Sequence, residues 1–142
     1  MALKRLLIVA HTPSENTRIM LGAIVRGAQS ATNDRIAIDA KTAFETNSEQ
    51  VIQAQAIILG TTENLGYMSG GLKDFFDRIY YPCLETTQGL PYSLVIRAGQ
   101  DGTGTLRAIE KIATGLRWRA VQKALICKGE WQPTFVTQCE EL

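Results

Sequence analysis

The chain has 142 residues, a formal net charge of +1 at pH 7 and 45% hydrophobic residues. This length is enough for one domain with a substantial core and too short for two comfortable ones, so we expect a single domain over residues 1–142. The 15 lysines and arginines are interleaved with 14 acids. That balance argues against nucleic acid and against a charged membrane surface as partners.

Cysteine and histidine usage bears on compartment and metal binding. Cys83, Cys127 and Cys139 are odd in number, lack C-x-x-C spacing and have only His11 beside them, so they make no convincing metal set. We interpret them as reduced core thiols of a cytoplasmic protein. The apolar run 6–10 is too short for a signal peptide and has no long apolar continuation, so we expect neither export nor a membrane span.

Short apolar runs alternate with segments of helical spacing along the whole chain. This alternation predicts an α/β fold, a doubly wound parallel sheet of five strands with helices on both faces. Strands are expected at residues 6–9, 36–38, 56–59, 93–96 and 125–127. Helices are expected at residues 17–31, 47–53, 69–80, 106–116 and 133–142, with a turn at 32–34 after the first and Pro82 ending the third.

The loop after the first predicted strand is rich in neutral hydrogen-bond donors. Thr12, Ser14, Asn16 and Thr17 lie within six positions, directly before a helical pattern. A strand, a loop and a helix N-terminus together leave several backbone N–H groups free for an anion. The alternative is a plain helix cap at Thr17 or Asn16. Because the loop lacks lysine and the G-x-x-x-x-G-K-[ST] pattern, a phosphate monoester held without a metal is the favoured ligand.

Two more unusual loops follow the third and fourth predicted strands, at the sheet edge where ligands of such folds bind. The first, residues 61–69, contains Gly66 and ends at Ser69, which is placed to cap the next helix. The second, residues 99–104, has a G-x-G spacing but lacks the third glycine of a dinucleotide fingerprint. Neither loop predicts a complete dinucleotide site.

These loops resemble those of the flavodoxin-like family. The likeness is to its FMN-dependent NAD(P)H oxidoreductases, related to the tryptophan-repressor-binding-protein type of quinone reductase. The stretch T-P-S-E-N-T is similar to the family's phosphate loop T-x-T-G-N-T, with Glu15 in place of glycine. The stretch G-T-T-E-N-L-G-Y-M-S-G-G-L-K-D-F-F-D is similar to G-T-P-x-x-x-G-x-M-S-x-x-L-K-x-F-x-D, with Thr62 where proline is frequent. The resemblance covers nearly the whole chain and implies the strand order 2-1-3-4-5.

The resemblance implies FMN as cofactor, NAD(P)H as electron donor and a quinone or another small molecule as electron acceptor. It leaves a homo-oligomer open. No catalytic side chain and no metal ligand is expected, because the flavin itself performs the hydride and electron transfer. The implied cofactor-binding residues are Thr12, Pro13, Ser14, Glu15, Asn16 and Thr17 at the phosphate, Thr61, Thr62, Glu63, Asn64, Leu65 and Gly66 at the isoalloxazine ring, and Gly99, Gln100, Asp101 and Gly102 at its pyrimidine end.

Three functions stay open at the level of sequence. The first is a reductase, and the second is a flavodoxin-type carrier of single electrons. Carriers are typically strongly acidic, so the near balance of 14 acids and 15 bases favours the reductase. The third, a scaffold that has lost its flavin, rests on Glu15 and Thr62. His11 is interpreted as a hydrogen-bonded structural residue at the end of a buried strand.

Overall fold

The structure of the protein is a computed structural model that describes residues 4–31 and 35–141. The turn predicted at residues 32–34 and the last residue of the final helix lie outside this range. The strands are β1 (Lys4–Ala10), β2 (Ile36–Thr42), β3 (Ala56–Asn64), β4 (Tyr67–Met68), β5 (Pro91–Ala98), β6 (Arg119–Ala120) and β7 (Leu125–Lys128). The helices are α1 (Glu15–Ala31), α2 (Ser48–Gln53), α3 (Gly70–Leu84), α4 (Thr103–Gly115) and α5 (Thr134–Glu141).

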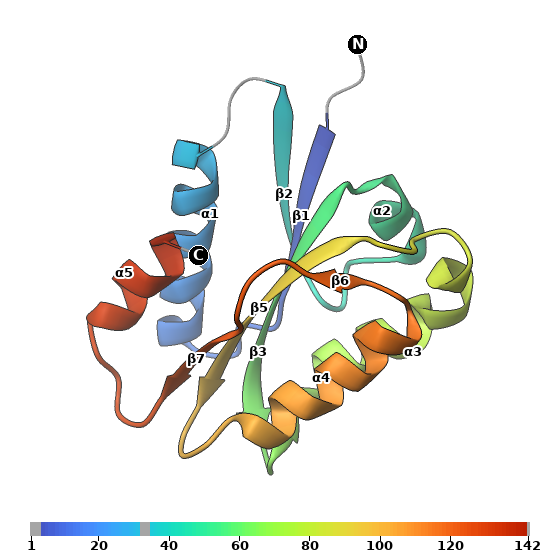
Figure 1. Cartoon of the computed structure of the whole chain (residues 1–142). Coiled ribbons are helices and arrows are strands. Elements are labelled where there is room, and N and C mark those ends of the chain that lie inside the picture. The colour runs from blue at the N-terminus through green and yellow to red at the C-terminus, as the bar shows by residue number, and fades with distance from the viewer. Residues whose placement is uncertain (1–3, 32–34, 142) are drawn as a thin grey trace.

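The long strands form one parallel sheet in the order β2-β1-β3-β5-β7 (Figure 1). This is the predicted order 2-1-3-4-5, which is confirmed. Two short strands were not predicted: β4 pairs antiparallel with the end of β3, and β6 pairs with the start of β5. Each has two residues, which is too short to leave a periodic pattern in the sequence.

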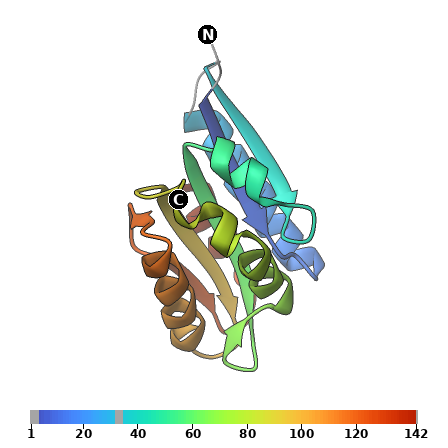
Figure 2. The same ribbon diagram turned by 90° about the vertical axis from the view of Figure 1, so that its right-hand side faces the viewer.

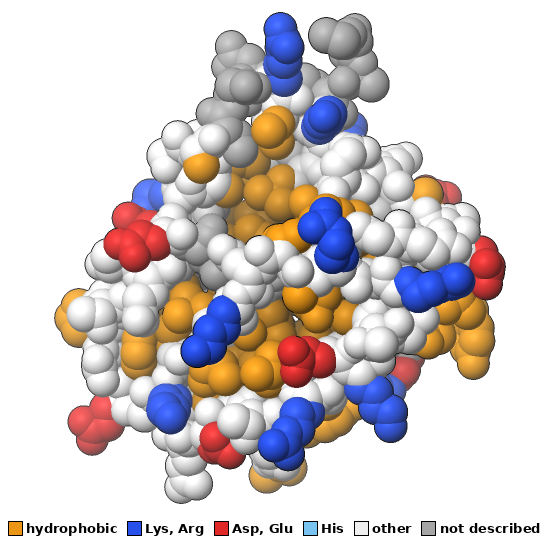
Figure 3. Space-filling model, viewed as in Figure 1, with side chains coloured by type: hydrophobic (Ala, Val, Ile, Leu, Met, Phe, Trp, Pro, Cys, Tyr) orange, Lys and Arg blue, Asp and Glu red, His pale blue; other side chains and the backbone are white. Residues whose placement is uncertain are grey.

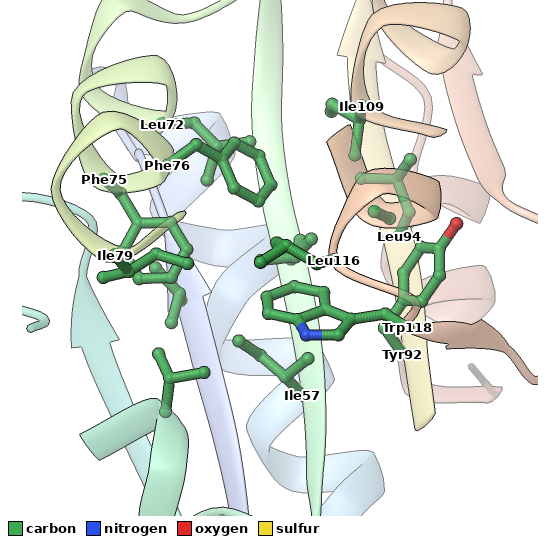
Figure 4. Packing of buried hydrophobic residues seen from close by; sticks show 14 of the residues in the cluster. Ile57, Leu72, Phe75, Phe76, Ile79, Tyr92, Leu94, Ile109, Leu116 and Trp118 are labelled. Carbon is green, nitrogen blue, oxygen red and sulfur yellow. The ribbon is translucent and has the colours of Figure 1, made fainter. Parts of the chain in front are cut away.

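Helices cover both faces of the sheet. Figure 2 shows α2, α3 and α4 in front of one face, while α1 and α5 pack on the other. The core beneath α3 and α4 is the larger of the two, and it includes Trp118 just after α4 (Figure 4). The labelled side chains that meet there are Ile57, Leu72, Phe75, Phe76, Ile79, Tyr92, Leu94, Ile109, Leu116 and Trp118.

Helix ends follow local hydrogen bonding, and the predicted end of α3 was wrong. Asn47 and Gln50 form the predicted capping box of α2. Pro82 does not end α3, which continues to Leu84. Proline lacks the N–H that would bond the carbonyl four residues earlier, so it removes one helical hydrogen bond without ending the helix. The last turn is completed by the hydroxyls of Thr86 and Thr87, which donate to the unpaired end carbonyls of residues 82 and 83.

Within residues 4–31 and 35–141, no helix is long and apolar enough to cross a membrane.

Candidate functional site

The three unusual loops all lie at the carboxyl edge of the sheet, the lower end of the strands in Figure 1. The loop after β1 leads into α1, the loop after β3 turns back into β4, and the loop after β5 leads into α4. The backbone of His11 donates to the Gly60 carbonyl at 3.1 Å, which ties the first loop to β3. The fold therefore brings together the segments that the sequence predicted to form one site.

The loop after β1 is organised by Ser14 and Thr17. The Ser14 Oγ accepts a hydrogen bond from the Thr17 backbone N–H at 3.2 Å, and the Thr17 hydroxyl donates to the Ser14 carbonyl at 2.9 Å. Ser14, rather than Asn16 or Thr17, is thus the cap of α1, which starts at Glu15. Thr17 is buried, whereas residues 13–16 are exposed.

Glu15 does not need the conformation that glycine allows. Among the described residues other than glycine, only Leu65 and Arg117 have positive φ. Glu15 is instead the first residue of α1, where a carboxylate interacts favourably with the helix dipole. Its side chain is exposed, so the glycine of the resembling motif is replaced without backbone strain.

The loop after β3 is a tight β-hairpin. Glu63 pairs with Met68 and Asn64 with Tyr67, which leaves Leu65 and Gly66 as a two-residue turn. Their φ values are 54° and 77°, the positive values of a type I′ turn. Leu65 at the tip is fully exposed.

The hairpin packs against the first turn of α4. A Cβ on Gly104 would lie 2.6 Å from the Gly66 carbonyl oxygen, so only glycine allows this approach. The Thr105 hydroxyl donates to Glu63 Oε2 at 3.1 Å. The second loop is therefore in direct contact with the start of α4, where the third loop ends.

Some predicted site residues serve this scaffold. The buried Thr61 hydroxyl accepts from the Ser69 backbone N–H at 3.0 Å, and Ser69 caps α3 as predicted. Gly102 is buried at the start of α4, with a φ of 83° and no room for a Cβ beside Ile126. Asp101 accepts from the Thr103 hydroxyl at 2.5 Å, which fits a turn residue.

The backbone remains accessible at the points where a flat ligand would need to approach it. No atom lies within 4 Å of the position that a Cβ would take at Gly66 or at Gly99. Both glycines are exposed, one in the hairpin and one after β5. Exposed glycines in two neighbouring loops leave room for a planar heterocycle with polar ring atoms to approach the backbone.

A fourth segment at the same edge was missed by sequence reasoning. The loop after β2 places Phe44, which is 61% exposed, edge-on to the His11 ring at 5.7 Å between centroids. A Cβ on Gly71 would lie 2.8 Å from His11 Nδ1, so glycine at this position makes room for the ring. The His11 side chain thus packs on an aromatic ring, and no hydrogen bond to it is found among the described residues, contrary to expectation.

Arg97, at the end of β5, was also missed. Its guanidinium donates to the carbonyls of Ala98, Cys127 and Gly129 at 2.7 to 3.0 Å and lies 5.0 Å from the centre of the Phe135 ring. The side chain borders a small cavity of about 20 Å³, which it shares with Thr12 and Thr17, among others. No pattern around Arg97 in the sequence marks it, because all but one of these partners are distant in the chain.

Comparisons with known proteins bear on the fold. No protein-family model and no curated protein matches the sequence. A flavodoxin from the domain Archaea superposes with a TM-score of 0.81 at 17% identity, covering 96% of this chain and 91% of its own. The fold is flavodoxin-like.

Two further flavodoxin-like structures extend this comparison. A WrbA-like flavodoxin from Agrobacterium tumefaciens has a TM-score of 0.75 at 15% identity, with 98% of this chain and 91% of that chain covered. An NADPH-quinone reductase from P. pentosaceus has a TM-score of 0.69 at 17% identity, with 98% and 96% covered. At these identities the likeness concerns the flavodoxin-like architecture alone.

Proposed function

We propose that the protein binds FMN at the carboxyl edge of its sheet. The observation that carries the proposal is the meeting of a helix N-terminus in a donor-rich loop with two glycine-containing loops whose backbone is open. In this arrangement residues 12–17 hold the phosphate, the hairpin at residues 62–66 lies along the isoalloxazine ring, and residues 99–102 meet its pyrimidine end. Bound FMN would supply hydride and electron transfer.

The roles within the phosphate loop follow from its hydrogen bonds. The Thr17 hydroxyl is held by Ser14, so it shapes the loop. The exposed Ser14 hydroxyl, which also caps α1, and the backbone N–H groups of residues 15 and 16 would face the phosphate. Asn16, exposed in the same turn, offers an amide donor.

A single substitution tests the phosphate assignment. Ser14→Gly removes the hydroxyl, while glycine at a cap position costs only a few tenths of a kcal/mol of stability, by the general trend. We expect FMN binding to weaken by about 2 kcal/mol, the value of a hydrogen bond to a charged group. Flavin fluorescence titration measures this loss.

Asn47→Gly is the matched control, because it removes the cap of α2, which lies outside the proposed site. It should leave FMN affinity unchanged. Equal FMN affinity in the Ser14→Gly variant and the parent protein would contradict the assignment, and a parent protein that binds no FMN would refute the proposed function altogether.

The finer proposal is an NAD(P)H-dependent oxidoreductase that passes electrons to a quinone or another small acceptor. Its support is the charge around the candidate loops, where Glu15, Glu63 and Asp101 are the acids of the predicted set and Glu63 is hydrogen-bonded to Thr105. Few negative charges next to a flavin make its two-electron reduction less costly. A carrier typically surrounds its flavin with acids.

Anaerobic mixing with nicotinamide separates these two functions. We expect excess NADPH or NADH to bleach the FMN-loaded protein within minutes. A sample that bleaches with dithionite but not with either nucleotide over an hour would instead support an electron carrier.

A further inference from the structure

Arg97 is a half-buried cation without an acidic partner. Its three hydrogen bonds go to backbone carbonyls, and no carboxylate pairs with it among residues 4–31 and 35–141. The ion pairs of the other arginines, such as that of Arg26 with Glu140, lie on the surface. Figure 3 shows basic and acidic side chains scattered over one face of the molecule. Carbonyl dipoles stabilise a guanidinium but leave its positive charge uncompensated.

The position of this charge relates it to the phosphate loop. Arg97 lies on the face of β5 that α1 and α5 cover, the face to which the neighbouring inward residue Val95 also points. It shares the wall of the small cavity with Thr12 and Thr17. The positive end of the α1 dipole is at the same place.

The charge of Arg97 and the positive end of the α1 dipole repel each other unless an anion lies between or beside them. The contacts of Arg97 also fix its side chain in place. The guanidinium donates to the carbonyls of Cys127 and Gly129, and it stacks on the Phe135 ring. A fixed, partly desolvated cation acts on a neighbouring anion more strongly than a mobile surface cation does.

We propose that Arg97 is a specificity-determining residue that makes this edge select phosphorylated over unphosphorylated flavin. The inference rests on the proposed FMN function and extends it to a residue outside the loops that the sequence pointed to. Arg97 acts through its charge across the small cavity, and its hydrogen bonds to the carbonyls hold that charge in position.

The test compares FMN with riboflavin, which lacks the phosphate, in the parent protein and in Arg97→Gln. We expect the glutamine variant to lose FMN affinity about tenfold, as for a charge pair in a medium of intermediate dielectric, while riboflavin affinity changes less than about twofold. Arg117→Gln is the matched control, because Arg117 also donates to a backbone carbonyl, that of Leu84, outside the proposed site. It should preserve both affinities.

A second variant, Arg97→Lys, separates charge from structure. Lysine keeps the charge but loses the planar fork, so the preference for FMN over riboflavin should survive even if the variant is less stable. The inference would be overturned if the ratio of FMN affinity to riboflavin affinity did not change in Arg97→Gln, or if Arg97→Lys lost the preference for FMN as fully as Arg97→Gln. Neither result would contradict the proposal that the protein binds FMN. A parent protein that binds neither flavin would overturn both proposals.

Discussion

Arg78 shows how one residue holds a loop at the carboxyl edge of the sheet in place. From α3 its guanidinium donates to the carbonyls of Ala43 and Thr46 at 2.7 and 2.6 Å, while Nε donates to Asp74 at 2.8 Å. These bonds span the loop that carries the exposed Phe44. The loop after β2 is therefore held from another element as well as by its own hydrogen bonds around Thr42.

Arg78→Lys should lower the free energy of unfolding by about 1 to 3 kcal/mol, because lysine cannot bridge both carbonyls. Hydrogen exchange of the backbone amides at residues 43–46 should also become faster, by the factor that corresponds to this loss of free energy. Asp74→Asn, which removes only the exposed ion pair, should cost less than about 0.5 kcal/mol. Equal losses in both variants would show that the carbonyl contacts are unimportant.

At the scale of elements, the β3–β4 hairpin combines strain with exposure. Leu65 adopts a φ of 54°, a region that a bulky side chain disfavours. Its side chain is fully exposed, so no packing offsets the strain. Asparagine followed by glycine is the sequence that a type I′ turn prefers. The leucine is thus unfavourable for stability, and under the proposed function it supplies apolar surface to the flavin ring.

Leu65→Asn should therefore raise the free energy of unfolding by about 0.5 to 1 kcal/mol while weakening FMN binding. Chemical denaturation and flavin titration measure the two effects. Val121→Asn is the control, since Val121 is also exposed but has no positive φ, and it should bring no gain. A loss of stability in Leu65→Asn would contradict the strain argument.

For the whole molecule, buried thiols link stability to alkaline pH. Burial raises the pKa of Cys83 from 9.0 to about 11, and it also raises that of Tyr92. The pKa of Cys139 is raised by its hydrogen bond with Cys127 and by burial. Cys127 shifts in the opposite direction, through its hydrogen bond with Cys139 and the nearby charge of Arg97.

The free energy of unfolding should fall as pH rises from 9 to 11. In this range the folded protein keeps the Cys83 proton while the unfolded chain loses it, so each step in pH favours unfolding. Cys83→Ala should flatten the decline, although it lowers stability at neutral pH by leaving a small cavity. Denaturation at pH 8, 9, 10 and 11 compares the slopes, and identical slopes would exclude this thiol as a cause.

The alternation of strands and helices, the helix faces and the edge at which the candidate site lies could be predicted from the sequence pattern. They depend on local periodicity and on the handedness of parallel crossovers, which act within short stretches of chain. The strand order was implied by the resemblance to the flavodoxin-like family. Local hydrogen bonding also made the caps at Asn47 and Ser69 predictable.

The folded structure was needed to show which loop residues hold the scaffold and which face outward. It paired Ser14 with Thr17, closed the hairpin onto α4 through Gly104, and placed Arg97 beside the loop after β1. It also ended α3 beyond Pro82. Except for the Ser14 pair, these outcomes depend on partners far away in the chain, and a periodic pattern in sequence contains no information about such partners. The Ser14 pair depends on where α1 begins, which local propensity leaves uncertain by a few residues.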